Sequence, residues 1–139
     1  MTTDSLTPYG ALLLRLGLGV MAMAHGFLKV FVFTIPGTVG FFESLGYPAF
    51  MAYAVIAGEL LGGAALIAGM QTRLVSIAMI PILIGATFTH AGYGWMFASP
   101  KGGWEFPAFW ALALGVQAMI GGGAWQLRVP FLNEVMERT

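Results

Sequence analysis

Four long apolar stretches, separated by short polar or Gly/Pro-rich connections, dominate the chain. A helix that crosses a membrane needs about 20 apolar residues at a rise of about 1.5 Å each. The stretches that meet this length lie at about 9–33, 49–70, 74–97 and 106–125. We therefore predict an all-α, integral membrane four-helix bundle that forms one domain over residues 1–139.

The composition supports the membrane class. Hydrophobic residues make up 58% of the chain and charged residues only 9%, whereas a soluble domain carries about 25% charged residues. The predicted partner is therefore the lipid bilayer, and the net charge of zero gives no sign of a nucleic-acid partner. The chain has no cysteine, which excludes a thiol nucleophile, a dithiol relay and cysteine-ligated zinc or iron–sulfur sites.

The basic residues set the predicted orientation, because cytoplasmic loops of membrane proteins carry an excess of Lys and Arg. Lys29 and Lys101 lie toward one side of the predicted bundle. The basic residues toward the other side are Arg15, Arg73, Arg128 and Arg138. This asymmetry places both termini in the cytoplasm.

The first predicted helix carries three ionisable residues on one stripe. At 100° per residue, Arg15, His25 and Lys29 share a face with the small residues Ala22 and Gly26. Ionisable groups inside a membrane cost a few kcal/mol on insertion scales, so each needs a partner or a function. We expect this stripe to face other helices rather than lipid.

Glu59 lies near the middle of the second predicted helix. Arg15 enters the membrane from the cytoplasmic end, and its long side chain can extend toward that depth. Buried charges are usually paired, so we predict a buried Arg15–Glu59 ion pair that fixes the packing of the helices. The functional alternative is a proton or cation site at Glu59.

A second set of polar residues is predicted near the outer surface. His25, Lys29, His90 and Glu105 fall at similar depths and are predicted to form one ligand-binding polar cup. In the alternative interpretation, Lys29 extends to the interface, Glu105 caps a helix and the histidines bond to carbonyl groups. Two histidines and a glutamate could ligate a metal, but the spacing matches no metal motif and no metal site is predicted.

Three segments, read together, resemble the DoxX family of small bacterial membrane proteins. They are LLRLGLGVMAMAHGFLKVF, GELLGGAALIAGMQTRLVSIAMIPI and GGWEFPAFWALALGVQAMIGGGAWQLR, and the resemblance covers about residues 9–128. It implies a four-helix bundle in the bacterial inner membrane. The family takes its name from a subunit of a thiosulfate:quinone oxidoreductase; many members are labelled oxidoreductases, and most have no established activity. The matching polar positions are Arg15, His25, Lys29, Glu59, Arg73 and Glu105.

Three hypotheses for the function follow. In the first, the chain is a membrane subunit or accessory of a redox system, and the polar cup binds a quinone or a similar apolar carbonyl compound. The sequence contains no evident electron carrier and assigns no catalytic residue, so this role needs a redox partner protein or a bound cofactor. Homo-oligomerisation is a further expectation. The alternatives are a small proton-coupled transporter that uses Glu59 and a membrane scaffold for a partner enzyme.

Overall fold

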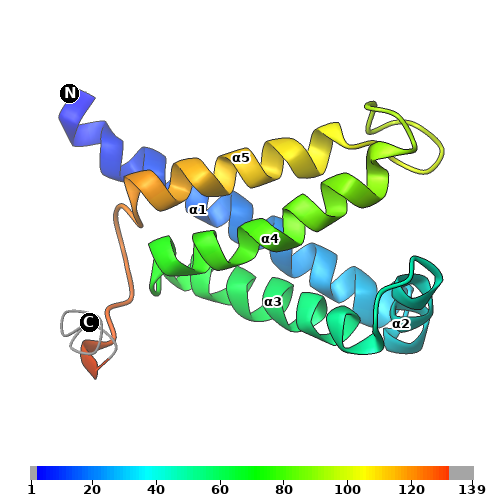
Figure 1. The fold of residues 1–139 in the computed structure, drawn as a ribbon. Coiled ribbons are helices and arrows are strands. Elements are labelled where there is room, and N and C mark those ends of the chain that lie inside the picture. Colours follow the sequence, from blue (N-terminus) through cyan, green and yellow to red (C-terminus); the bar gives the residue numbers. More distant parts are fainter. Residues whose placement is uncertain (1–2, 132–139) are drawn as a thin grey trace.

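A computed structural model describes residues 3–131, and every regular element within them is a helix (Figure 1). In chain order the elements are α1 (Thr3–Phe27), the π-helical turn η1 (Leu28–Val32), α2 (Ile35–Ser44), α3 (Ala49–Ala68), α4 (Thr72–Ala91) and α5 (Glu105–Ile120). The all-α prediction is confirmed. Arg138, which contributes to the predicted orientation, lies outside the described residues.

The long helices run back and forth between two ends of the bundle. α1 packs mainly on α3, and α4 packs mainly on α5. The start of the chain, the α3–α4 turn and the segment after α5 lie at one end, while α2 and the α4–α5 loop lie at the other (Figure 1). We name the first the Arg15 end, which also carries Arg73 and Arg128. The second is the Lys29 end, which also carries Lys101 and Glu105.

Three of the helical segments are long and apolar enough to cross a membrane. They are the continuous stretch Thr3–Val32, α3 and α4. α5 is also apolar but has only 16 residues, which is about 24 Å of helix. The bundle therefore contains the four predicted apolar helices, and one of them is shorter than a full membrane span.

The predicted bounds are wrong at several helix ends. The first helix begins at Thr3 rather than near residue 9. The fourth ends at Ile120 rather than near residue 125, because Gly121 and Gly123 take positive φ values of 80° and 72°, which end a right-handed helix. The third ends at Ala91, before the loop that contains Gly94. The second, predicted at 49–70, ends two residues earlier than expected.

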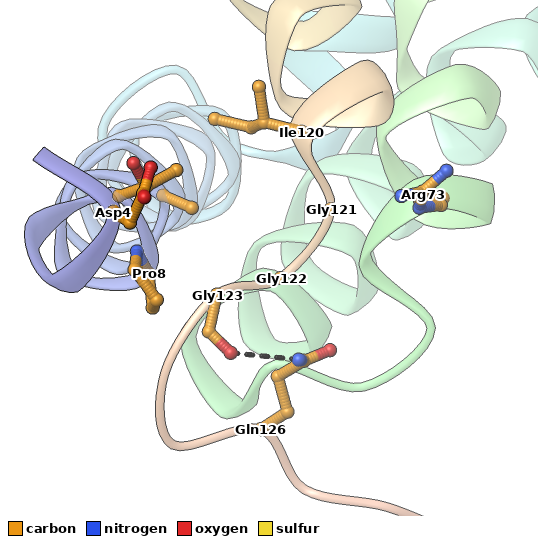
Figure 2. Close-up of a pocket in the computed structure, with 10 residues that line it drawn as sticks. Asp4, Pro8, Arg73, Ile120, Gly121, Gly122, Gly123 and Gln126 are labelled. Atoms are coloured by element: carbon orange, nitrogen blue, oxygen red, sulfur yellow. Dashed lines mark hydrogen bonds between the residues drawn. The ribbon is translucent and has the colours of Figure 1, made fainter.

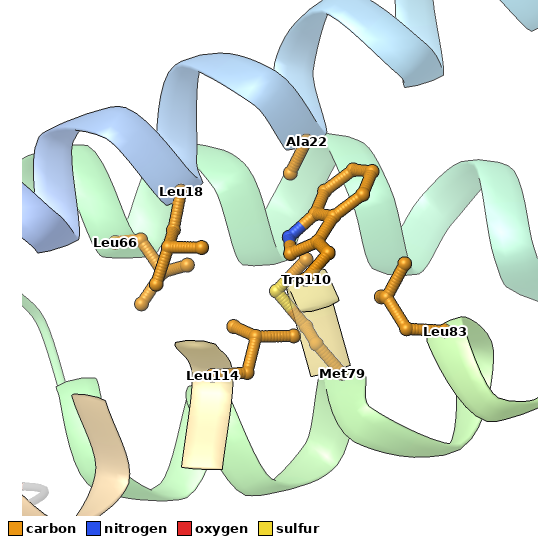
Figure 3. Close-up of a cluster of buried hydrophobic side chains, with 7 residues drawn as sticks. All are labelled: Leu18, Ala22, Leu66, Met79, Leu83, Trp110 and Leu114. Carbon is orange, nitrogen blue, oxygen red and sulfur yellow. The ribbon is translucent and has the colours of Figure 1, made fainter. Parts of the chain in front are cut away.

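The core lies where α1, α3, α4 and α5 meet (Figure 3). Its buried side chains are Leu18, Ala22, Leu66, Met79, Leu83, Trp110 and Leu114. α1 and α3 approach closely at Gly19 and Gly63, where a Cβ atom on Gly63 would lie 2.9 Å from the Gly19 carbonyl oxygen. Small residues permit such close contact between membrane helices. The contact fixes which residues of α1 and α3 stand at the same depth.

Candidate functional site

The Lys29 end holds a buried ion pair. Lys29 Nζ lies 2.9 Å from each of the two carboxylate oxygens of Glu59. Glu59 is only 4% exposed. Because Nζ carries three N–H groups and uses two of them here, one donor remains for another acceptor.

Lys29 reaches Glu59 from an irregular turn of its helix. The π-helical turn η1 follows α1 directly, and the Phe33 amide bonds to the Leu28 carbonyl at 3.0 Å. The hydroxyl of Thr38, a buried residue of α2, lies within donating distance of two carbonyls, that of Thr34 at 2.9 Å and that of Lys29 at 3.1 Å. π-helical turns of this kind are rare and occur often at functional sites.

The predicted Arg15–Glu59 pair is wrong. Arg15 is fully buried and instead donates all five of its N–H groups to backbone carbonyls. The acceptors, at 2.9–3.3 Å, are Leu66, Ile67, Gly122, Ala124 and Trp125. The physical reason is depth: Arg15 lies opposite Ile67, which is about 12 Å along α3 from Glu59. There the last carbonyls of α3 lack the amide four residues further on that carbonyls inside a helix have, although the Leu66 carbonyl also accepts the Gly69 amide at 3.2 Å.

His25 lies beside the ion pair and against α5. Its Nδ1 lies 2.8 Å from the Met21 carbonyl, and a carbonyl only accepts, so Nδ1 donates and Nε2 of the neutral ring is an acceptor. The ring stacks on Phe106, with 6.0 Å between centroids, and contacts Trp110 at 4.8 Å. The buried Trp110 indole nitrogen has no hydrogen-bond partner among the described residues.

His90 and Glu105 take other partners at the same end. His90 Nδ1 bonds to the Ala86 carbonyl at 2.7 Å, and the ring contacts Tyr93. Glu105 Oε1 accepts the Phe97 amide at 2.9 Å and so ties the α4–α5 loop to the start of α5. The structure thus divides the predicted cup into two groups, His25 with Lys29 and Glu59, and His90 with Glu105 beside the loop.

An aromatic cavity at the Lys29 end, which was not predicted from the sequence, has Glu105 in its wall. It has a volume of about 660 Å³ and is lined by Trp95, Phe97, Trp104, Glu105, Phe106, Ala108, Phe109 and Leu112. Phe106 forms part of its wall and also stacks on His25. Phe109 and Leu112 are 70% and 63% exposed on the outer face of α5. The signal in the sequence was the density of aromatic residues between 93 and 110.

Within the described residues, no group of three or more histidine or acidic side chains is arranged to hold a metal ion. Lys29, which is cationic, occupies both oxygens of Glu59. The polar groups described here offer hydrogen bonds and charge.

Comparison with known proteins places these features in a family. The DoxX family model matches residues 10–92, a range that includes Arg15, His25, Lys29, Glu59 and His90. A protein of Bacillus subtilis (strain 168) named "Putative oxidoreductase CatD" is 42% identical over 80 residues.

That alignment covers 58% of this chain and 58% of the Bacillus protein, so the chain spans little more than half the length of this relative. No solved structure matches the chain. The family match covers more than half of the chain, and the helices it includes are long and apolar enough to span a bilayer. The chain is a multi-pass membrane protein that belongs to the DoxX family.

Proposed function

We propose that this protein is the membrane component of a redox system in the bacterial inner membrane, and that it binds a quinone or a similar apolar carbonyl compound at its Lys29 end. The observation that carries the proposal is the aromatic cavity, whose wall residue Phe106 stacks on His25 of the His25–Lys29–Glu59 group. Flat aromatic walls suit a conjugated ring, since stacked and edge-to-face ring contacts are favourable. The name of the Bacillus relative also supports an oxidoreductase role.

The position of the cavity suits a ligand that arrives through lipid. Phe109 and Leu112 are largely exposed on the apolar surface of α5, so the cavity opens sideways toward the bilayer. A quinone with an isoprenoid tail could enter there and leave its tail among the lipid chains. The carboxylate of Glu105 is the charged group in the cavity wall.

Three groups that do not line the cavity, but lie behind the Phe106 ring, are suited to carbonyl or hydroxyl oxygens. The third N–H of Lys29 and the indole N–H of Trp110 are donors, and Nε2 of neutral His25 is an acceptor. In this proposal the chain binds and orients the compound, and a redox partner protein or bound cofactor transfers the electrons.

The proposed orientation in the membrane rests on the difference in basic residues between the Arg15 end and the Lys29 end. Arg73 and Arg128 flank the Arg15 end, where the described part of the chain begins and finishes. The excess of basic residues supports a cytoplasmic location for this end and for both termini. The aromatic cavity then lies in the outer leaflet. The single domain over 1–139 and self-association of the chain remain predictions.

The transporter hypothesis makes a different demand on Glu59. A carboxylate that couples transport to protons must release its partner during the cycle, whereas Lys29 holds both of its oxygens in this structure. The scaffold hypothesis needs docking surface at the ends of the bundle. The aromatic cavity favours the ligand-binding role over both.

Quinone binding can be measured through the tryptophans of the cavity. Trp95 and Trp104 line it, so titration with decylubiquinone should quench their fluorescence to saturation. Phe106→Leu keeps an apolar side chain but removes the ring. It should raise the quinone dissociation constant by about two- to tenfold, since one aromatic contact contributes about 0.5–1.5 kcal/mol.

The matched control is Phe88→Leu. Phe88 is 74% exposed on α4 and lies outside the cavity lining, so its loss should leave the dissociation constant unchanged. Quenching that does not saturate in the unsubstituted protein, or that is equal in both variants, would contradict the proposed site.

A further inference from the structure

Two adjoining cavities lie at the Arg15 end, away from the proposed quinone site. The larger, of about 540 Å³, lies between the start of α1 and the segment after α5, and the smaller, of about 260 Å³, lies between that segment and the start of α4. Arg73, Gly122 and Gln126 line both cavities. Figure 2 shows the larger one, with Gly121–Gly123 passing between Asp4 on one side and Arg73 on the other.

Three arginines surround the smaller cavity. Arg73 and Arg128 line it directly. Arg15 lies behind its wall, because Gly69 and Gly122 both line the cavity and both contact the Arg15 guanidinium group. The cavity therefore concentrates positive charge in a small volume.

These charges have no carboxylate partner within the described residues. The salt bridge of residues 3–131 is Lys29–Glu59, at the opposite end. Arg15 is bonded to neutral carbonyls alone. Asp4 lines the larger cavity, but it lies across the glycine segment from Arg73 (Figure 2). Clustered arginines attract negative charge, so an anion bound here would be stabilised.

Donors without hydrogen-bond partners among residues 3–131 also lie beside this region. α4 begins at Thr72, and the first amides of a helix present donors and a positive dipole end. Thr72 lines the smaller cavity, is only 3% exposed, and its hydroxyl has no hydrogen-bond partner among the described residues. A buried hydroxyl without a partner is uncommon and calls for a ligand or an ordered water.

We propose that the smaller cavity is a binding site for a phosphate group, either the head group of an anionic phospholipid or a soluble phosphate compound. Guanidinium groups bind phosphate oxygens in two-pronged geometry, and a helix N-terminus adds backbone donors to the same oxygens. Arg73, Arg128 and the Thr72 hydroxyl supply the side-chain donors. This site does not depend on quinone binding at the Lys29 end.

The experiment uses the full chain in nanodiscs and separates the two sources of phosphate. In one arm, inorganic phosphate is titrated into protein in phosphatidylcholine discs. In the other, phosphatidylglycerol replaces part of the phosphatidylcholine without free phosphate. The readout is the rise in thermal unfolding midpoint, which follows ligand binding to the folded state. The variants are Thr72→Val and Arg73→Gln, with Lys101→Gln as a control that loses one charge at the opposite end.

We expect at least one arm to raise the midpoint in the unsubstituted protein and in Lys101→Gln. The apparent affinity should fall at least tenfold in Arg73→Gln and severalfold in Thr72→Val, which changes no charge and nearly conserves volume. A response to inorganic phosphate identifies a soluble ligand, and a response confined to phosphatidylglycerol identifies a lipid. No response in either arm, or an equal response in Thr72→Val and the unsubstituted protein, would overturn the site.

Discussion

Arg15→Met should prevent stable assembly of the bundle. The Arg15 side chain ties the end of α3 to the segment after α5 through five backbone carbonyls. Each buried acceptor that loses its donor costs about 1–3 kcal/mol. We expect the free energy of unfolding to fall by at least about 3 kcal/mol on this basis. Thermal unfolding in detergent, together with the amount of protein in the membrane fraction, measures the effect.

Arg15→Lys separates the hydrogen bonds from the charge. Lysine preserves the positive charge that orients the bundle, but it has three donors on one nitrogen and cannot reproduce the planar fork. The Arg15→Lys protein should therefore lose nearly as much unfolding free energy as the Arg15→Met protein. The control is Lys101→Met, which removes an exposed charge at the other end. An Arg15→Lys protein as stable as the unsubstituted one would show that the five carbonyls are not held by this side chain.

Lys29→Met should be nearly as damaging, for a different reason. It leaves Glu59 buried without its cation, and breaking a buried ion pair from one side costs about 3–5 kcal/mol. Glu59→Gln should cost less, because Lys29 is partly exposed and a lysine can extend toward the interface. The double variant should recover much of the stability lost in Lys29→Met.

A double-mutant cycle on unfolding free energies distinguishes the two candidate partners of Glu59. The Lys29–Glu59 cycle should give a coupling of at least about 1 kcal/mol, as residues in direct contact do. The Arg15–Glu59 cycle should give a coupling close to zero, because these side chains lie at different depths. A larger coupling energy for Arg15–Glu59 than for Lys29–Glu59 would contradict the observed ion pair and support the predicted one.

The apolar pattern predicted the helices well, since membrane helices can be recognised from the length and hydropathy of a segment. α3 matches its predicted range within two residues. The errors lie at helix ends, where single glycines decide the outcome. Gly121 and Gly123 are part of an apolar run that a hydropathy argument extends to residue 125, but their positive φ values end the helix earlier.

The site could be predicted only in part. The pattern marked Arg15 and Glu59 as buried groups that need partners and assigned Lys29 to the polar cup, but pairing depends on the relative depth of two helices. That depth is fixed by contacts such as Gly19 on Gly63, which no helical wheel contains. The partners of Arg15 could not be predicted for another reason. They are backbone carbonyls, and every residue type carries one.

The aromatic cavity at the Lys29 end is the central claim, and photolabelling tests it most directly. The protein in nanodiscs would be irradiated with an azidoquinone, digested, and the labelled peptides mapped by mass spectrometry. We predict labelling within residues 95–112, lost when unlabelled decylubiquinone is present in excess. Labelling spread over exposed lipid-facing residues such as Ile77 and Phe88, and unaffected by the competitor, would contradict the account.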